Sequence, residues 1–403
     1  MSEDQSATGT SSLELQIAAL TQSVQSNQES IGNATRSNAI KAARGLLSAL
    51  VPPPETVIQD VALNCALPMA LRMGVQLEAF KMIASNPSQG TTSQQIAEKS
   101  GGSVILVDQI MRLLTAAGYA LEDDVQTYRP SPLTMVMADP TIEATTRVCF
   151  DVGHFCTTSA PAFFRKNNNQ YPSSAKDTPF QLGLNTELSY FDWLGQNPEP
   201  AKDFQQWMTL KQQATPNWID WFDLQGTIVK DFRSERADDV LLVDVGGGEG
   251  HYLHALNQKF ADLPGRLVLQ DLPQVISSIA DPPQRTELMA HDFFTPQPVK
   301  GARAYYMHWI LHDWPDDQAR IILSNIVESM EPGYSRLIIN EQIIPDRDCD
   351  LPTACISIMM MVQVAAFERT EKQWRELLTS VGLKDIAFHQ APGGGEGIIE
   401  AIR

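Results

Sequence analysis

The chain has 403 residues, of which 43% are hydrophobic and 19% charged, an ordinary globular composition with room for two or three domains. The formal net charge of −18 disfavours a nucleic acid partner, because binding a phosphate backbone depends on clustered Lys and Arg. No apolar run approaches the roughly 20 residues that cross a bilayer, so we expect no association with a membrane.

The polar, acidic N-terminus MSEDQSATGTSS has neither the basic start nor the apolar region of a signal peptide, which predicts a cytoplasmic protein. The five cysteines are scattered without a C-x-x-C pair or a zinc-type spacing with histidine. They are expected to be reduced thiols.

Residues 1–38 are predicted to form a disordered tail and a first helix. The tail extends to about residue 12, and the helix has apolar positions from Leu13 to Val24. A second helix is predicted over Ala39–Leu50, ending before the prolines at 52–54. Apolar faces on such terminal helices often pack against a second subunit. We therefore expect a homodimer formed through the N-terminal domain.

The segment 39–135 has the pattern of a helix-turn-helix with a wing. Thr92 or Ser93 can cap one helix, Gly101 and Gly102 end it, and a second helix begins near Val104. Such a module binds DNA when its second helix is basic, but here that helix has no positive stripe. A structural or dimer-forming role is the favoured alternative.

Residues 136–225 are predicted to be mainly helical and are rich in aromatic side chains. These side chains, including Trp207 and neighbouring Met208, either form a helical core or line an apolar substrate pocket. The sequence leaves both interpretations open.

From residue 226 to 403 strands alternate with helices, starting with VLLVDVGGGEGHYLHAL at Val240. This alternation predicts an α/β fold with a parallel, doubly wound sheet. Ligands of such sheets bind at the carboxyl ends of the strands.

The glycine turn after the first strand does not fit a dinucleotide. The pattern G-x-G-x-x-G starting at Gly246 requires glycine or alanine at residue 251, where the chain has His251. Asp271 ends the next strand, where its carboxylate can accept hydrogen bonds from both ribose hydroxyls. Asp292 follows the third strand, where its carboxylate can accept a hydrogen bond from an adenine amino group. A nucleoside without phosphates, S-adenosylmethionine, fits these features; a generic nucleotide-type turn with another ligand is the alternative.

The stretch YYMHWILHDWPDD begins at Tyr305 like a buried strand and ends like the start of a helix. His308 and His312 lie four residues apart in this stretch. Three interpretations are open: the two are metal ligands, they are structural side chains, or one of them is a base directed at a substrate. A metal pair is disfavoured because the two lie partly on a strand and no third ligand has a fitting spacing.

Six motifs carry a resemblance to a known family: DVGGGEGH, LQDLP, HDFF, WILHDWPDD, INE and FERTEKQW. Their order and spacing resemble those of the plant and fungal S-adenosylmethionine-dependent small-molecule O-methyltransferases, in which the caffeate and flavonoid enzymes have relatives in fungal secondary metabolism. The likeness is strong over about 180 C-terminal residues. It implies a Rossmann-like class I methyltransferase domain preceded by an α-helical winged-helix dimerisation domain.

The resemblance also implies roles for particular residues. His312 of the HDW motif would be the general base, oriented by Glu341 and Glu368. The residues that would hold the cofactor are Gly246, Gly248, Asp271, Asp292, Phe293 and His308. The family usually has Lys or Arg where this chain has His308, which is a departure from the pattern.

Methyl transfer explains why these residue types are present. A phenol hydroxyl has a pKa of about 10 and is a poor nucleophile at neutral pH, whereas a histidine can accept its proton during attack on the methyl carbon. The two glutamates could instead form structural ion pairs with Arg369 or Lys372. Met359 and Phe367 either pack in the core or line the pocket of a flat hydrophobic acceptor.

The sequence thus predicts an O-methyltransferase that methylates a hydroxyl of an aromatic or polyketide-derived molecule by an SN2 step. The first alternative is a methyltransferase-like enzyme that uses bound S-adenosylmethionine as a fixed charge for dehydration or pericyclic cyclisation. Retention of His312 with both glutamates favours methyl transfer, since a charge-only role needs no base. A DNA-binding regulator is the second alternative, disfavoured by the lack of a basic helix.

Overall fold

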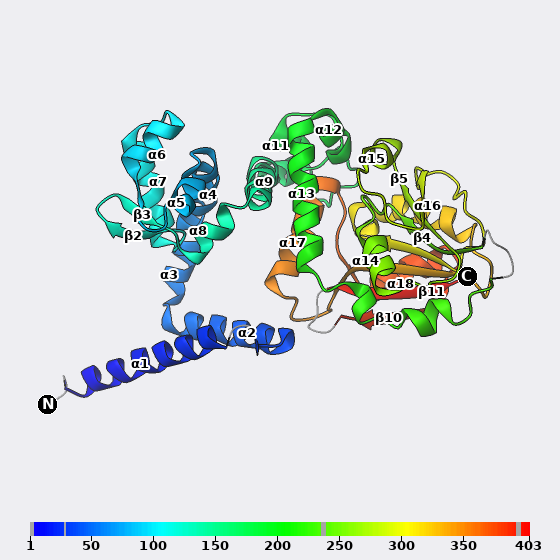
Figure 1. The fold of residues 1–403 in the computed structure, drawn as a ribbon, viewed down its shortest axis with the longest axis horizontal. Coiled ribbons are helices and arrows are strands. Elements are labelled where there is room, and N and C mark those ends of the chain that lie inside the picture. Colours follow the sequence, from blue (N-terminus) through cyan, green and yellow to red (C-terminus); the bar gives the residue numbers. More distant parts are fainter. Residues whose placement is uncertain (1–3, 28–29, 235–238, 392–395) are drawn as a thin grey trace. The chain divides into compact units, whose positions relative to one another are not determined.

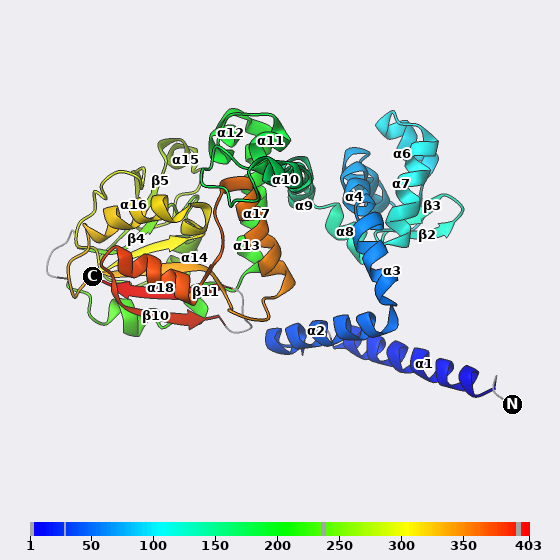
Figure 2. The same ribbon diagram turned by 180° about the vertical axis from the view of Figure 1, so that it is seen from behind.

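The structure is a computed structural model that describes residues 4–27, 30–234, 239–391 and 396–403 (Figures 1 and 2). It divides into two compact units, one ending at Gln59 and the other beginning at Asp60. Across the described residues, every helix is too short or too polar to span a bilayer.

The first unit consists of three helices. They are α1 (Asp4–Ser26), α2 (Asn33–Leu50) and α3 (Pro53–Ile58). The helix predicted from Leu13 to Val24 is part of α1. The disordered tail predicted up to residue 12 is wrong from Asp4 onward, because the helical backbone continues through this Ser/Thr-rich stretch. The boundary predicted after residue 38 falls inside α2.

The second unit opens with the winged-helix module. Its helices are α4 (Ala66–Gln76), α5 (Ala79–Ser85), α6 (Ser93–Ser100) and α7 (Val104–Ala116). Thr92 caps α6 in a capping box with Gln95, and Gly101 ends it at a φ of 70°. The strands β1 (Thr91–Thr92), β3 (Thr127–Arg129) and β2 (Leu121–Asp124) form the small antiparallel sheet. The predicted helix-turn-helix with a wing is confirmed.

A run of helices follows, as expected for residues 136–225. They are α8 (Pro132–Met137), α9 (Pro140–Val148), α10 (Phe155–Lys166), α11 (Pro179–Leu184), α12 (Tyr190–Gln196) and α13 (Pro198–Ala214). A π-helical turn, Cys149–His154, joins α9 to α10. Aromatic side chains of α11, α12 and α13 pack in one core cluster with apolar residues of α17 (Leu351–Val364).

The C-terminal part contains the large sheet. Its strands lie in the order β10 (Lys384–Gln390), β11 (Glu396–Ile402), β8 (Arg336–Ile344), β7 (Ala304–His308), β4 (Val240–Val245), β5 (Arg266–Asp271) and β6 (Thr286–Ala290). A short strand, β9 (Arg369–Thr370), also pairs with β8.

The predicted parallel sheet is confirmed from β6 to β8 but not at the C-terminal edge. Strand β11 pairs antiparallel with β8, and β10 pairs antiparallel with β11. Only about five residues separate these last two strands, whereas a parallel crossover needs a dozen or more. Strands pair in a hairpin when the connection is this short.

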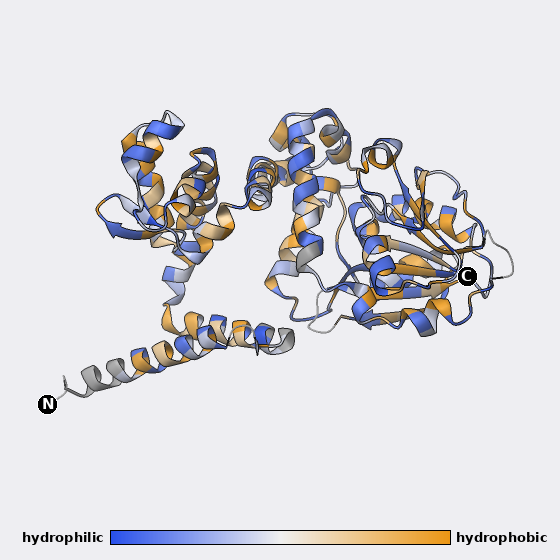
Figure 3. Cartoon of the chain, in the orientation of Figure 1, coloured by the Kyte–Doolittle hydropathy of each residue, from blue (hydrophilic) through white to orange (hydrophobic). Residues whose placement is uncertain are grey.

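Helices cover both faces of the large sheet. On one face lie α16 (Asp316–Val327) and α18 (Glu371–Ser380), and on the other lies α14 (His251–Lys259). A short helix, α15 (Pro273–Ser278), follows β5. The central strands β4 and β7 are buried along their whole length, and Figure 3 shows orange, hydrophobic stretches in the sheet. Because β4, β5, β6 and β7 are parallel, their carboxyl ends meet at one edge of the sheet, where Gly246, Asp271, Asp292 and His308 lie.

Candidate active site

The loop that carries His312 begins where β7 leaves the sheet. Trp309 has a φ of 50°, in the left-handed region that non-glycine residues rarely adopt, and a 3-10 turn from Leu311 to Asp313 follows. The N–H groups of Ile310 and Leu311 both donate to Glu341 Oε1, each over 2.9 Å. These bonds fix the turn, and with it the buried ring of His312.

The second glutamate binds the ring itself. His312 Nδ1 lies 2.7 Å from Glu368 Oε1, while Glu341 Oε2 is 3.8 Å from the same nitrogen. The opposite nitrogen, Nε2, lies 3.6 Å from Asp313 Oδ1. The structure thus brings together the three predicted catalytic residues and leaves Nε2 as the nitrogen that is not bound to a glutamate.

Electrostatics favour a charged His312 ring in the protein alone. Burial lowers the pKa of His312, but the carboxylates of Glu368, Glu341 and Asp313 outweigh it and raise the pKa to about 10. Burial also raises the pKa of Asp313 to about 6, and that of Glu341 to about 7 against the opposing effect of His312.

Arg369 holds the loop from the other side. Its buried guanidinium donates to the carbonyls of Leu311 and Trp314, over 2.8 and 2.9 Å, and to Asp316 Oδ1 over 2.8 Å. Arg369 therefore pairs with Asp316, and Lys372 pairs with Glu376. These pairings differ from the structural alternative, in which Arg369 or Lys372 would form an ion pair with Glu341 or Glu368.

The glycine turn after β4 closes against the loop of His312. Gly246 has a φ of 73°, and a Cβ there would lie 2.6 Å from Ile310 Cδ1 and 3.7 Å from the Phe293 ring. Gly248 has a φ of 59°, a Cβ there would meet open space, and its N–H donates to Asp271 Oδ2 over 2.9 Å. The turn, Phe293 and Asp271 thus lie together.

The other two predicted cofactor residues lie further along the strand ends. Asp292 follows β6 and accepts the Phe294 N–H over 2.9 Å, with an exposed side chain. His308 is buried instead among polar groups, 3.1 Å from Glu396 Oε2 and 3.3 Å from the Tyr252 hydroxyl. Burial lowers the pKa of His308, consistent with a neutral ring. A cofactor contact by His308 stays a prediction.

Sequence reasoning missed Asp244, near the end of β4. This carboxyl is 1% exposed, and its Oδ2 has no hydrogen-bond partner in the described part of the chain. Burial first, and then Asp271, raise its pKa to about 7. A carboxylate within an apolar strand directly before a glycine turn is the signal that could have identified it.

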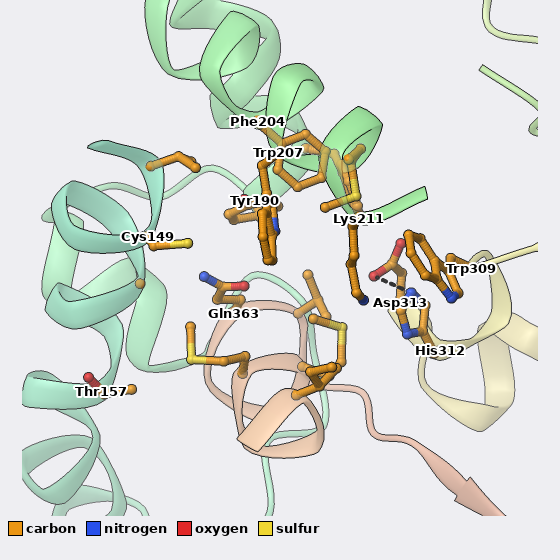
Figure 4. Close-up of a pocket in the computed structure, with 18 of the residues that line it drawn as sticks. Cys149, Thr157, Tyr190, Phe204, Trp207, Lys211, Trp309, His312, Asp313 and Gln363 are labelled. Carbon is orange, nitrogen blue, oxygen red and sulfur yellow. Dashed lines mark ion pairs between the residues drawn. The ribbon is translucent and has the colours of Figure 1, made fainter. Parts of the chain in front are cut away.

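A cavity of about 300 Å³ opens beside His312, between α13, α17 and the loop after β7 (Figure 4). Trp207, Met208 and Met359 line it, as predicted for substrate-binding residues. Phe367 is not among its lining residues but packs edge-on against Tyr171 and near the Arg369 guanidinium. The structure therefore groups three of the four.

Several lining residues were not anticipated from the sequence. They are mainly apolar or aromatic, and the charged ones are Asp313 and Lys211. Lys211 lies one helical turn after Trp207 on α13, so the i, i+4 spacing from a predicted pocket residue could have revealed it.

His312, Glu341 and Glu368 also meet a geometric condition for metal binding. One ligand atom from each lies within 4.8 Å of the others, and all three residues are buried. His308 is not part of this group. The expectation that the protein uses no metal remains a prediction.

Comparison with known proteins decides the family. Residues 191–384 match the O-methyltransferase domain family. The O-methyltransferase mpaG of Penicillium brevicompactum is 34% identical over 366 residues, 90% of this chain and 92% of that protein. The demethylsterigmatocystin 6-O-methyltransferase of Aspergillus parasiticus is 34% identical over 332 residues, 82% and 84% of the two chains. The chain belongs to the O-methyltransferase family.

Solved structures share the fold of this chain. LepI in complex with S-adenosylmethionine superposes on this O-methyltransferase with a TM-score of 0.86 and 30% identity, over 97% of this chain and 100% of that one. A structure described as a pericyclic reaction enzyme gives the same TM-score at 29% identity, over the same shares of the two chains. The family resemblance and the two-part α/β fold predicted from the sequence are confirmed.

Proposed function

We propose that this O-methyltransferase transfers a methyl group from S-adenosylmethionine to a hydroxyl of an aromatic or polyketide-derived small molecule. One observation carries the proposal: His312 faces an apolar cavity while its Nδ1 is bound to Glu368. The name of the relative that methylates demethylsterigmatocystin supports a secondary metabolite as the acceptor.

The residues at the glycine turn suit S-adenosylmethionine. The open space in front of Gly248 leaves room for a ligand against the backbone, and Asp271 has lone pairs left for ribose hydroxyls after accepting two backbone N–H groups. The free Oδ2 of Asp244 can accept a hydrogen bond from the ammonium group of the cofactor. When bound, the cofactor supplies a methyl group activated by its sulfonium charge.

His312 would act on the acceptor through Nε2. The hydroxyl proton passes to this nitrogen as the oxygen becomes a nucleophile, and Glu368 stabilises the resulting imidazolium at Nδ1. Without a ligand, the surrounding carboxylates favour the protonated form of His312, which cannot accept a proton. A positively charged ligand nearby would lower the pKa of His312 and so favour the neutral ring that acts as a base. Glu341 would serve mainly to hold the loop.

A second function has a specific observation in its favour. The similarity to the pericyclic reaction enzyme supports the alternative in which bound S-adenosylmethionine acts as a fixed charge. The buried His312–Glu368 pair favours methyl transfer instead, because a charge-only role requires no base.

The discriminating experiment supplies methyl-labelled S-adenosylmethionine with a panel of phenols, naphthols and pyridones. Methyl transfer predicts label in the product and one S-adenosylhomocysteine per product molecule. Product that forms while the cofactor remains intact would establish the charge-only function.

We also propose that the protein is a homodimer formed through its N-terminal helices. Leu13, Leu20 and Val24 form a stripe along α1 at helical spacing and are 42%, 62% and 45% exposed in the single chain. A second subunit would cover such a stripe.

A further inference from the structure

Lys211 places a positive charge inside the acceptor cavity. It belongs to the last turn of α13, on the face that also presents Trp207 and Met208 to the cavity. Figure 4 shows its side chain extending from the helix toward Asp313 and His312, beside Trp309. Its Nζ lies 3.9 Å from the centre of the Trp309 ring.

The Lys211 ammonium group forms no ion pair with a carboxylate in the part of the chain that the structure describes. Among the described residues it makes no hydrogen bond, and its direct contact is with the Trp309 ring. Burial lowers the pKa of Lys211, while more distant carboxylates act to raise it; these belong to Glu368, Glu396, Asp313 and Glu341. An enclosed charge without a direct partner is costly unless a ligand supplies one.

We infer that Lys211 selects acceptors that carry an anionic oxygen, such as a carboxylate or an ionised enol, next to the hydroxyl to be methylated. The inference rests on the proposed function, because it assigns the acceptor class of that same site. The anionic oxygen binds the Lys211 ammonium, while the neighbouring hydroxyl faces His312 Nε2.

The positions of Lys211 and His312 explain why the two oxygens of the acceptor must be neighbours. His312 Nε2 lies 3.6 Å from Asp313 Oδ1, and Figure 4 shows the Lys211 side chain directed toward the same carboxyl. The strained backbone of Trp309 and its ring, which stacks on His308 with centroids 4.3 Å apart, fix the surface on which the Lys211 charge rests. The distance between the two recognised oxygens is thereby set by the protein.

The alternative is that Lys211 only packs, with its aliphatic stem against apolar neighbours and its charge in water. The two explanations differ in chemical selectivity. If Lys211 only packs, its removal should change the affinity for charged and neutral ligands alike. If Lys211 recognises an anionic oxygen, its removal should weaken the binding of a ligand that has this second oxygen more than that of a ligand that lacks it.

The test uses 1-hydroxy-2-naphthoate and 1-naphthol, which share a ring system and a hydroxyl and differ in the neighbouring carboxylate. Their Kd values are measured by equilibrium dialysis against the full-length protein loaded with S-adenosylhomocysteine. Lys211→Met removes the charge and keeps the length of the side chain. Lys202→Met makes the same change at an exposed position of α13 outside the cavity.

We expect the wild-type protein and Lys202→Met to prefer the naphthoate. Lys211→Met should weaken naphthoate binding by about 10- to 100-fold, the usual range for a hydrogen bond to a charged group, and change naphthol binding by less than about threefold. Equal losses for both compounds, or a wild-type protein that prefers the naphthol or binds neither, would overturn the inference. Since binding is measured without methyl transfer, failure of the proposed reaction would appear separately, in the labelling experiment.

Discussion

At the scale of single residues, the environment of His312 determines the chemistry. Three carboxylates surround one imidazole ring, and only Glu368 is within hydrogen-bonding distance of it. Glu341 instead accepts two backbone N–H groups, so the two glutamates have different tasks although the sequence motifs treat them alike.

Replacing His312 with alanine should remove the proton acceptor and leave the glycine turn intact. We expect turnover to fall at least about 10²-fold, with cofactor affinity nearly unchanged. Steady-state kinetics and calorimetric titration with S-adenosylhomocysteine measure the two effects. Unchanged turnover would remove His312 from the mechanism.

Replacing Glu368 with glutamine should change the pH dependence of the reaction. Glu368 is the strongest of the groups that raise the pKa of His312, so its loss lowers that pKa, and the neutral ring becomes available at lower pH. The rising limb of kcat/KM against pH should therefore move to lower pH while its plateau falls.

Glu376→Gln is the matched control for this profile, since Glu376 is exposed on α18 and forms an ion pair with Lys372. Its profile should coincide with that of the wild type. A rising limb that stays in place, or moves to higher pH, in Glu368→Gln would contradict the assigned role.

At the scale of secondary structure, the glycine turn between β4 and α14 joins the cofactor residues to the catalytic loop. Gly246 and Gly248 both have a positive φ, but only Gly246 has a neighbour that a Cβ would strike. The two glycines are therefore a matched pair for separating stability from binding.

Gly246→Ala should lower the free energy of unfolding by about 2–5 kcal/mol, the sum of left-handed backbone strain and the clash with Ile310. Gly248→Ala should cost only about 1–2 kcal/mol, from strain alone, but weaken cofactor binding because its methyl group enters the open space. Denaturant titration and calorimetry measure both. Equal stability losses would contradict the close contact with Ile310.

The same elements show what local sequence can predict. The glycine turn, β4 and the capped helix α6 were predictable because their signals lie within a few neighbouring residues. The direction of β11 was not, because the alternation of side chains is the same in parallel and antiparallel strands. The length of the connection after β10 carried that information.

The site was predictable to a similar degree. His312, Glu341 and Glu368 lie far apart in the chain, and only their motifs, not any spacing rule, allowed them to be grouped. Lys211 and Asp244 were missed because their importance comes from burial. The i, i+4 spacing of Lys211 from Trp207 and the position of Asp244 within an apolar strand were only indirect signals of that burial. Phe367 was assigned to the pocket from hydrophobicity alone, which does not indicate where a side chain points.

At the scale of the whole molecule, subunit association is the open prediction. Changing Leu20 and Val24 to glutamate places charges on the apolar stripe of α1, and we expect this double variant to sediment as a monomer where the wild type sediments as a dimer. Ala18→Glu with Gln22→Glu adds the same charges to the opposite side of the helix and should leave the dimer intact. Dissociation by both variants, or by neither, would count against the stripe as the interface.

The central claim is that His312 takes the proton from the acceptor hydroxyl. The most direct measurement is the distance between His312 Nε2 and the acceptor oxygen, in a crystal structure with S-adenosylhomocysteine and an acceptor that the labelling experiment has identified. We predict a separation within hydrogen-bond range, roughly 2.6–3.2 Å. A ring that points away from the acceptor, or an oxygen too far from it for even a bridging water, would contradict the account.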